Sequence, residues 1–267
     1  MLFRSFCVGR LWEGIRMRRI LITNDDGIGA PGIMALQEAL MELGDILVVS
    51  PDGPRSAQSN AITSVVPLRL HQVKGEEGLA VYKCSGTPTD CVKMALNLIA
   101  DRRPSMVVSG INHGVNTSIS VIYSGTMGAA LEGCVDDVAS FGISIDDYSR
   151  DADMTHAAEY ARKVAEWVLK NGLPRYTCLN VNVPKGKPKG VKWCRQAQGS
   201  WKEEFERRVD PYGHNYYWLG GEFVNHEPGV PGTDQEAVES GMVSIVPVRL
   251  DMTDFGFLEK MEKDFKF

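Results

Sequence analysis

The chain has 267 residues, of which 43% are hydrophobic, and a formal net charge of −5. This length suits one large domain or one domain with an appendage, and the hydrophobic fraction suffices for a substantial core. The lack of a basic excess argues against a protein that coats nucleic acid, and no apolar run is long enough to span a membrane. Six cysteines without a C-x-x-C pair give no signal for a thioredoxin motif or a zinc ribbon, and they favour a reducing cytoplasm.

Residues 1–16 are predicted to be an N-terminal extension. They are mildly apolar, contain arginines and are poor in acidic residues. Two interpretations stay open: a targeting segment, or an upstream start that precedes a functional chain beginning near Met17. The remainder divides into a core over residues 17–195, a protruding arm over 196–240, and a final strand with a C-terminal tail over 241–267.

The first predicted strand, Arg19 to Thr23, ends abruptly in Asn24-Asp25-Asp26-Gly27. Taken alone, this segment is better explained as a solvated turn than as a binding site. Two adjacent carboxylates after a buried strand are also explained if they lie at the carboxyl end of a central parallel strand, where open α/β sheets bind ligands. A divalent cation would offset their charge.

A helix is predicted from about Ala30 to Leu43, and a second buried strand covers residues 46–50. Strand, helix and strand form a βαβ unit, whose crossover should be right-handed. The polar loop over residues 51–60 leaves the carboxyl end of the second strand, so it should lie beside the two aspartates. Apolar–polar alternation over residues 64–83 predicts a β-hairpin.

The segment Gly86-Thr87-Pro88-Thr89-Asp90 precedes a predicted helix over residues 91–100. Thr87 as N-cap, proline at the first helical position and Asp90 at the third form a capping box, which explains the motif structurally. The alternative is that its hydroxyls and free N–H groups also hold an anion.

The rest of the chain alternates strands and helices. A strand over residues 106–109 ends in a loop over 110–116, and a helix starts at Tyr123-Ser124-Gly125-Thr126. Further strands are predicted over about 141–145, 177–183 and 242–248, a long helix over about 153–170, and an amphipathic tail over 255–267. These elements predict an α/β fold with a mostly parallel central sheet.

Aromatic residues crowd a Gly- and Pro-rich region without helical periodicity: Trp201, Phe205, Tyr212, Tyr216, Tyr217, Trp218 and Phe223. We expect a protruding hairpin arm. Its aromatic residues fit a surface for a partner or a second small core, and the sequence does not choose between the two.

Three strand-end loops should converge on one site. They bring together the carboxylates of Asp25 and Asp26, the hydroxyl of Ser56 and the amide oxygen of Asn112. Oxygen ligands suit Mg²⁺, Mn²⁺ or Ca²⁺ rather than zinc or copper. The helix starts at Thr87 and Ser124 could supply donors to a phosphate bound beside the cation.

Five motifs in order resemble the SurE family, the survival-protein nucleotidases. They are Asn24-Asp25-Asp26-Gly27 with Ala30-Pro31-Gly32, Pro54-Arg55-Ser56 with Ser59-Asn60, Gly86-Thr87-Pro88-Thr89-Asp90-Cys91, Ser109-Gly110-Ile111-Asn112, and Tyr123-Ser124-Gly125-Thr126. They cover about residues 17–248. The resemblance implies a Rossmann-like three-layer α/β/α core and a metal-dependent phosphomonoesterase acting on nucleoside 5′- and 3′-monophosphates, often with activity on short polyphosphate. It also implies homodimers or homotetramers built by exchange of C-terminal elements, including the arm.

The resemblance implies that Asp25, Asp26, Ser56 and Asn112 bind one divalent cation per subunit. The expected substrate contacts are Asn60, Thr87, Ser109, Gly110, Asn116, Ser124, Gly125 and Thr126. We expect a water on the cation to attack phosphorus, with Asp25 or Asp26 accepting its proton. A rival mechanism makes Asp25 a nucleophile that forms an aspartyl-phosphate.

His113 is a tempting general acid because it adjoins Asn112. Neighbouring positions on an extended segment point to opposite sides, which predicts that His113 faces away from the site.

Three other functions compete with the nucleotidase interpretation. A haloacid-dehalogenase-like phosphatase needs two aspartates separated by one residue, whereas Asp25 and Asp26 are adjacent. A nucleotide-binding module without catalysis has little need of adjacent carboxylates, and no G-x-G-x-x-G or P-loop follows the first strand. A structural oligomer would make the acidic loop incidental.

Overall fold

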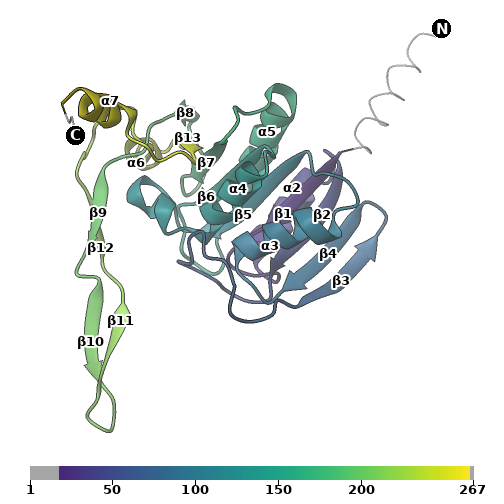
Figure 1. Ribbon diagram of the computed structural model, residues 1–267, viewed down its shortest axis with the longest axis horizontal. Helices are drawn as coiled ribbons and strands as arrows, with labels where there is room; N and C mark the ends of the chain where they lie inside the picture. Colours follow the sequence, from purple (N-terminus) through teal and green to yellow (C-terminus); the bar gives the residue numbers. More distant parts are fainter. Residues whose placement is uncertain (1–17, 265–267) are drawn as a thin grey trace.

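The structure is a computed structural model that describes residues 18–264. Its centre is a nine-stranded sheet in the order β3-β4-β2-β1-β5-β6-β7-β13-β8 (Figure 1). The strands are β1 Arg19–Thr23, β2 Asp45–Pro51, β3 Leu70–Glu76, β4 Leu79–Cys84, β5 Met106–His113, β6 Ser140–Ile145, β7 Thr177–Val183, β8 Val191–Trp193 and β13 Val243–Arg249. Six pairings are parallel, and only β3 with β4 and β7 with β13 pair antiparallel among these strands. The predicted N-terminal extension over residues 1–16 lies outside the described residues.

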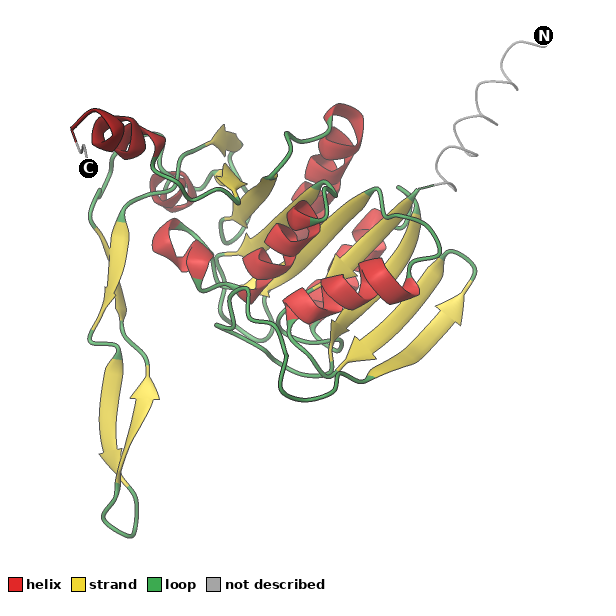
Figure 2. Ribbon diagram, viewed as in Figure 1, coloured by secondary structure: helices red, strands yellow, loops and turns green. Residues whose placement is uncertain are grey.

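Helices cover both faces of the sheet, as Figure 2 shows. α2 (Pro31–Leu40) and α5 (Thr155–Asn171) pack on one face, and α3 (Pro88–Met94) and α4 (Gly125–Val135) pack on the other. The split follows from the strand period of two, because Ile20 and Ile22 join the first cluster whereas Leu21 joins the second. The predicted three-layer α/β/α architecture is confirmed.

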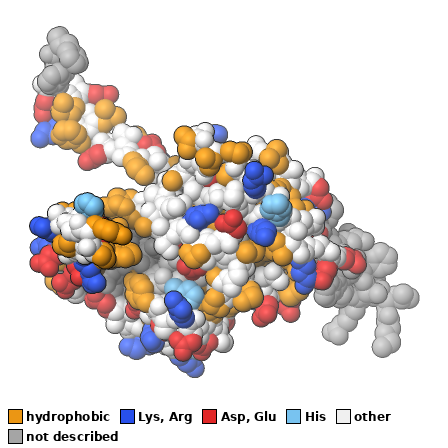
Figure 3. All heavy atoms as spheres, turned by 90° about the horizontal axis from the view of Figure 1, so that it is seen from below, with side chains coloured by type: hydrophobic (Ala, Val, Ile, Leu, Met, Phe, Trp, Pro, Cys, Tyr) orange, Lys and Arg blue, Asp and Glu red, His pale blue; other side chains and the backbone are white. Residues whose placement is uncertain are grey.

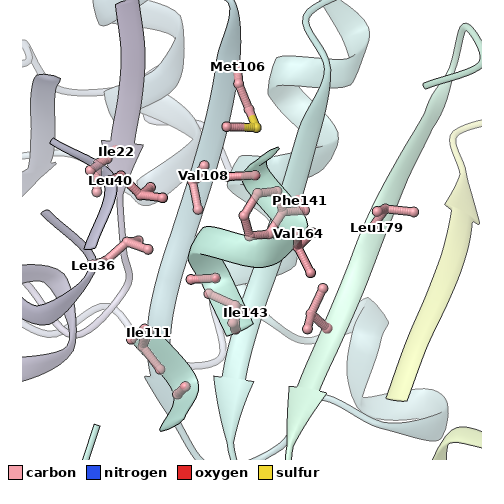
Figure 4. Packing of buried hydrophobic residues seen from close by; sticks show 14 of the residues in the cluster. Ile22, Leu36, Leu40, Met106, Val108, Ile111, Phe141, Ile143, Val164 and Leu179 are labelled. Atoms are coloured by element: carbon pink, nitrogen blue, oxygen red, sulfur yellow. The ribbon is translucent and has the colours of Figure 1, made fainter. Parts of the chain in front are cut away.

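The larger core cluster lies between the sheet and the helices α2 and α5. Phe141 and Ile143 of β6 pack there against Val164 of α5, while Ile22 and Leu36 meet across β1 and α2 (Figure 4). Burying each such side chain contributes roughly 1.5–3 kcal/mol. The core therefore holds the strand ends, and the loops that leave them, in one fixed arrangement.

Several predicted boundaries were wrong. The strand expected to end at Ser109 continues to His113, because Asn112 and His113 resume pairing with Ser144 and Ile145 beyond an irregularity in the register. The first strand of the hairpin begins at Leu70 rather than near residue 64. The helix expected over residues 91–100 starts at Pro88 and ends in a π-helical turn, Ala95–Ile99.

The arm consists of two short antiparallel ladders in succession. β9 (Gly199–Lys202) pairs with β12 (Glu222–Asn225) near the core, and β10 (Phe205–Val209) pairs with β11 (Asn215–Leu219) farther out. Figure 1 shows the outer ladder extending away from the sheet. All ten residues of β10 and β11 are exposed, so this ladder forms no second core.

Hydrophobic side chains gather on the arm, which is seen end-on at the left of Figure 3. The C-terminal helix α7 (Phe255–Asp264) has no buried residue and exposes Phe257 and Leu258. The helix α6 (Asp234–Glu239) instead packs against β13, with Ala237 fully buried. Within the described residues, no helix has both the length and the hydrophobicity of a transmembrane segment.

Candidate active site

A cavity of about 450 Å³ opens at the carboxyl ends of β1, β5 and β6. This is the edge of the sheet at which open α/β folds bind their ligands. Of the residues predicted for the site, six line the cavity together: Asp25, Asp26, Ser56, Asn112, Asn116 and Ser124. The predicted convergence of loops therefore takes place.

The Asn24-Asp25-Asp26-Gly27 loop is held by its own polar groups. The Asn24 side chain donates to the Gly27 carbonyl at 2.9 Å and accepts from the Ser50 hydroxyl at 2.6 Å. Gly27 has φ +96°, which favours glycine. Asn24 is 0% and Asp25 4% exposed, so the interpretation of this segment as a solvated turn was wrong.

Asp25 is the most enclosed charge in the cavity. Its Oδ1 accepts a 2.6 Å hydrogen bond from the Thr126 hydroxyl, and Gly125 packs so closely that a Cβ there would lie 2.9 Å from the Cβ of Asp25. Burial, together with the neighbouring charge of Asp26, raises the pKa of Asp25 to about 6. Positive charge placed beside the two carboxylates would relieve this cost.

His113 contacts the site, contrary to prediction. Its Nδ1 lies 3.3 Å from Oδ2 of Asp26, and both His113 and its neighbour Asn112 line the cavity. The alternation of an ideal strand fails here because the pairing of β5 with β6 shifts register between Ser109 and Asn112. The Nε2 atom of His113 is buried and has no hydrogen-bond partner in the described part of the chain.

The remaining oxygen donors suit a hard cation. The Asn112 amide nitrogen donates to the carbonyls of His113 and Gly114 at 3.1 and 2.7 Å, so its nitrogen is engaged by backbone and its Oδ1 can act as a ligand. Ser56 is exposed at the cavity. Residues 18–264 contain no group of three or more His, Cys, Asp or Glu side chains placed to hold a metal ion. A cation would depend on Asp25 and Asp26 with these neutral oxygens, a set that fits Mg²⁺, Mn²⁺ or Ca²⁺.

Ser124 and Asn116 enter the cavity from loops that are firmly anchored. The Ser124 hydroxyl accepts from the Met127 N–H at 3.1 Å and so caps α4. Asn116 receives its position from buried polar groups, because its side chain donates to Ser144 at 2.9 Å and its N–H to Asn182 Oδ1 at 2.7 Å. Both residues line the same cavity as the two aspartates.

The other predicted contacts do not line the cavity: Asn60, Thr87, Ser109, Gly110, Gly125 and Thr126. Thr87 forms the predicted capping box, accepting from the Asp90 N–H at 3.1 Å while its own N–H donates to Asp90 at 2.9 Å. Gly110 has φ +138°, and a Cβ there would lie 2.3 Å from the Ile143 carbonyl oxygen. Thr126 and Gly125 position Asp25, and their direct contact with substrate stays a prediction.

Sequence reasoning missed the aromatic wall of the cavity. Tyr148 follows β6, and its ring covers Gly114, where a Cβ would lie 2.2 Å from the ring. The position of Tyr148 directly after a strand end could have identified it from the sequence as a residue of the site. Trp201, Glu204 and Leu219 reach the same cavity from the arm, and no local pattern marks them.

Comparison with known proteins supports the predicted resemblance. The family model described as Survival protein SurE matches residues 20–203. The chain is 46% identical over 244 residues to the 5′-nucleotidase SurE of Phocaeicola vulgatus, covering 91% of this chain and 95% of that protein. It is 49% identical over 247 residues to the 5′-nucleotidase SurE of Christiangramia forsetii, with coverages of 91% and 95%.

The fold agrees with a solved structure. The crystal structure of a SurE protein from Aquifex aeolicus superposes with a TM-score of 0.78 at 34% sequence identity, covering 92% of this chain and 98% of that one. Sequence and structure thus lead to the same family over nearly the whole chain. The chain belongs to the SurE family of survival proteins.

Proposed function

We propose that this chain is a nucleotidase that hydrolyses the phosphate ester of nucleoside monophosphates with the help of a divalent cation. The observation that carries the proposal is the adjacent pair Asp25 and Asp26 in a strand-end cavity of about 450 Å³. Two relatives that share nearly half of their residues with this chain are named 5′-nucleotidase, which supports the same activity here.

The chain's own residues fit a resident cation. Asp25, Asp26, Ser56 and Asn112 supply only oxygen. The pKa of Asp25 is raised by its burial and, to a smaller extent, by the charge of Asp26, and a cation beside the two carboxylates would offset both costs. A bound Mg²⁺ or Mn²⁺ supplies positive charge that stabilises the phosphoryl group as its ester bond breaks.

Proton transfer falls to the carboxylates and to His113. A water molecule attacks phosphorus, and Asp25 or Asp26 accepts its proton. Asp26 can hold His113 by Nδ1, and the buried Nε2 donates a proton to the departing ester oxygen once a small turn of the ring brings it to the cavity. The rival mechanism, in which Asp25 forms an aspartyl-phosphate, predicts a phosphorylated enzyme that can be trapped on Asp25.

The substrate phosphate is expected beside Ser124, at the start of α4. The hydroxyl of Ser124 and the first N–H groups of this helix are suited to an anion, and Asn116 offers an amide nearby. Asn60, Thr87, Ser109, Gly110, Gly125 and Thr126 are retained as predicted contacts or supports of this position.

Nucleoside monophosphates are the proposed main substrates, and short polyphosphate a secondary one. The cavity already contains the carboxylates of Asp25, Asp26 and Glu204. Their negative charge repels a polyphosphate more strongly than a substrate that carries a single phosphate.

We also propose self-association through the C-terminal elements. The outer ladder of the arm and α7 expose aromatic and aliphatic side chains, which supports burial against another copy of the chain. Sedimentation should show a dimer or tetramer, and the double variant Phe257→Glu with Leu258→Glu should reduce its mass. A monomeric wild type would contradict this.

The free thiols of Cys84, Cys91, Cys134, Cys178 and Cys194 support a cytoplasmic location.

One assay decides between the enzyme and a module that only binds nucleotides. Purified protein is incubated with AMP or GMP and Mn²⁺, and released phosphate is measured. We expect hydrolysis that is lost on chelation and in Asp26→Ala. If the protein binds nucleotides but shows no metal-dependent hydrolysis of nucleotides or of polyphosphate, the binding module is favoured.

A further inference from the structure

The cavity has two chemically different ends. Asp25, Asp26 and His113 form the polar end at the sheet, whereas Trp201, Glu204, Leu219 and Gly220 reach it from the arm. These four residues lie where the inner ladder of the arm meets the outer one. The arm therefore contributes a wall to the cavity in addition to the surface that it exposes.

The base of the arm is fixed to the active-site loop. The Ser118 hydroxyl donates to the Ala197 carbonyl at 2.9 Å, and the carboxylate of Asp234 accepts from the N–H groups of both residues at 2.9 Å. Gly199 sits so close that a Cβ there would lie 2.8 Å from the Ser118 hydroxyl oxygen. These contacts hold the arm wall, the part of the cavity lining formed by Trp201, Glu204, Leu219 and Gly220, in a fixed position relative to the core. Ser120 and Tyr123, which follow Ser118, line the same cavity.

Trp201 presents a pre-positioned ring. It is directly opposite Phe223 in the inner ladder, and the two rings pack edge to face with their centroids 5.9 Å apart. Trp201 is half-buried, which leaves part of the indole at the cavity. A fixed aromatic face suits the flat face of a nucleobase, because stacking costs little further ordering of the side chain.

Glu204 is an unusual residue for a site that accepts a phosphate. It lies in the kink between the ladders, where its carbonyl accepts from the Gly220 N–H at 2.8 Å. A Cβ at Gly221 would lie 2.8 Å from the Lys202 carbonyl oxygen, so the kink is tight. The carboxylate of Glu204 forms no hydrogen bond or ion pair with any other residue of the range 18–264.

A free carboxylate repels phosphate but accepts hydrogen bonds from hydroxyls. The part of a nucleotide that offers two adjacent hydroxyls is the ribose, and a carboxylate has two oxygens to receive them. We propose that the nucleoside half of the substrate binds to the arm wall, with its base stacked on Trp201 and its ribose hydroxyls donating to Glu204. This rests on the proposed nucleotidase function and assigns its specificity to the arm.

The inference is tested by kcat/KM for three substrates with Mn²⁺: AMP, ribose 5-phosphate and 2′,3′-dideoxyadenosine 5′-monophosphate. In Trp201→Ala, the value for AMP and for the dideoxy substrate should fall about tenfold or more, mainly through KM, because one stacking contact is lost. Ribose 5-phosphate has no base, so its value should not change. Trp201→Phe should recover most of the loss.

Glu204→Gln should show the complementary pattern. Hydrolysis of AMP and ribose 5-phosphate should fall about tenfold. The dideoxy substrate lacks both ribose hydroxyls and should be unaffected. Trp193→Ala and Glu222→Gln are matched controls that remove an exposed indole and an exposed carboxylate that do not line the cavity, and they should change none of the three values.

The outcomes distinguish failure of the proposed nucleotidase function from failure of the proposed role of the arm. If wild type hydrolyses none of the three substrates, the proposed function fails and the inference fails with it. If wild type hydrolyses AMP but each variant changes all substrates equally, or none, the nucleotidase stands and the arm wall has no role in recognition.

Discussion

Nδ1 of His113 lies 3.3 Å from Oδ2 of Asp26, and both side chains are mostly buried, with 17% and 22% of their surfaces exposed. The contact joins the end of β5 to the loop after β1. It orients an imidazole beside the carboxylates, with a second ring nitrogen that no described residue engages.

Replacing His113 should slow the hydrolysis of substrates whose leaving oxygen needs a proton. His113→Asn is expected to lower kcat for AMP by about 100-fold or more, the usual contribution of general acid catalysis. 4-Nitrophenyl phosphate has a leaving group that is stable without protonation, so its kcat should fall much less. An equal loss for both substrates would assign His113 a purely structural role.

Divalent cations should stabilise the folded chain, which can be measured without any assay of activity. At about 100 times its Kd, Mn²⁺ should add about 2.7 kcal/mol to the free energy of unfolding, which corresponds to a rise in Tm of about 5–10 °C for a chain of this size. Asp26→Asn should lose most of this rise, and Asp151→Asn, an exposed aspartate away from the cavity, should keep it. An identical rise in both variants would place the cation elsewhere.

Gly32 should not tolerate a larger side chain. It lies in the first turn of α2, where a Cβ would be 2.0 Å from the Ile111 carbonyl oxygen of β5. Gly32→Ala must push α2 away from the strand that carries Asn112, and it should lower the free energy of unfolding by about 1–3 kcal/mol. Gly29→Ala is the control, because nothing lies within 4 Å of the added atom. Equal free energies of unfolding for the two variants, measured in urea, would contradict the close packing of Gly32 against Ile111.

Asp234 should be essential for joining the arm to the core. Its carboxylate is fully buried and accepts hydrogen bonds from the N–H groups of Ser118, Ala197 and Gln235. Asp234→Ala leaves these donors without their acceptor, and it should lower the free energy of unfolding by about 2–4 kcal/mol. Limited proteolysis should also cut the base of the arm faster than in wild type or in Asp151→Ala. Resistance equal to wild type would show that the anchor is dispensable.

Local chemistry along the chain was sufficient to predict much of this protein. Continuous apolar runs such as Ile46 to Val49 identified buried parallel strands, and helical spacing predicted the long helix α5, whose buried face contains Ala161 and Val164. The capping box at Thr87 was predicted because it depends only on residues three positions apart. The convergence of Asp25, Ser56 and Asn112 followed from one topological rule about strand ends.

The tertiary structure decided what depends on contacts between distant segments. The direction of His113 is set by a register shift between β5 and β6, and an alternation rule read along one strand cannot anticipate it. The arrival of Trp201 and Glu204 at the cavity depends on the buried Asp234, which holds a segment that is distant in sequence against Ser118. The sequence by itself determined the family, the sheet and the carboxylates after its first strand. Long-range packing decided which side chains enclose them, because enclosure is a property of segments brought together only by folding.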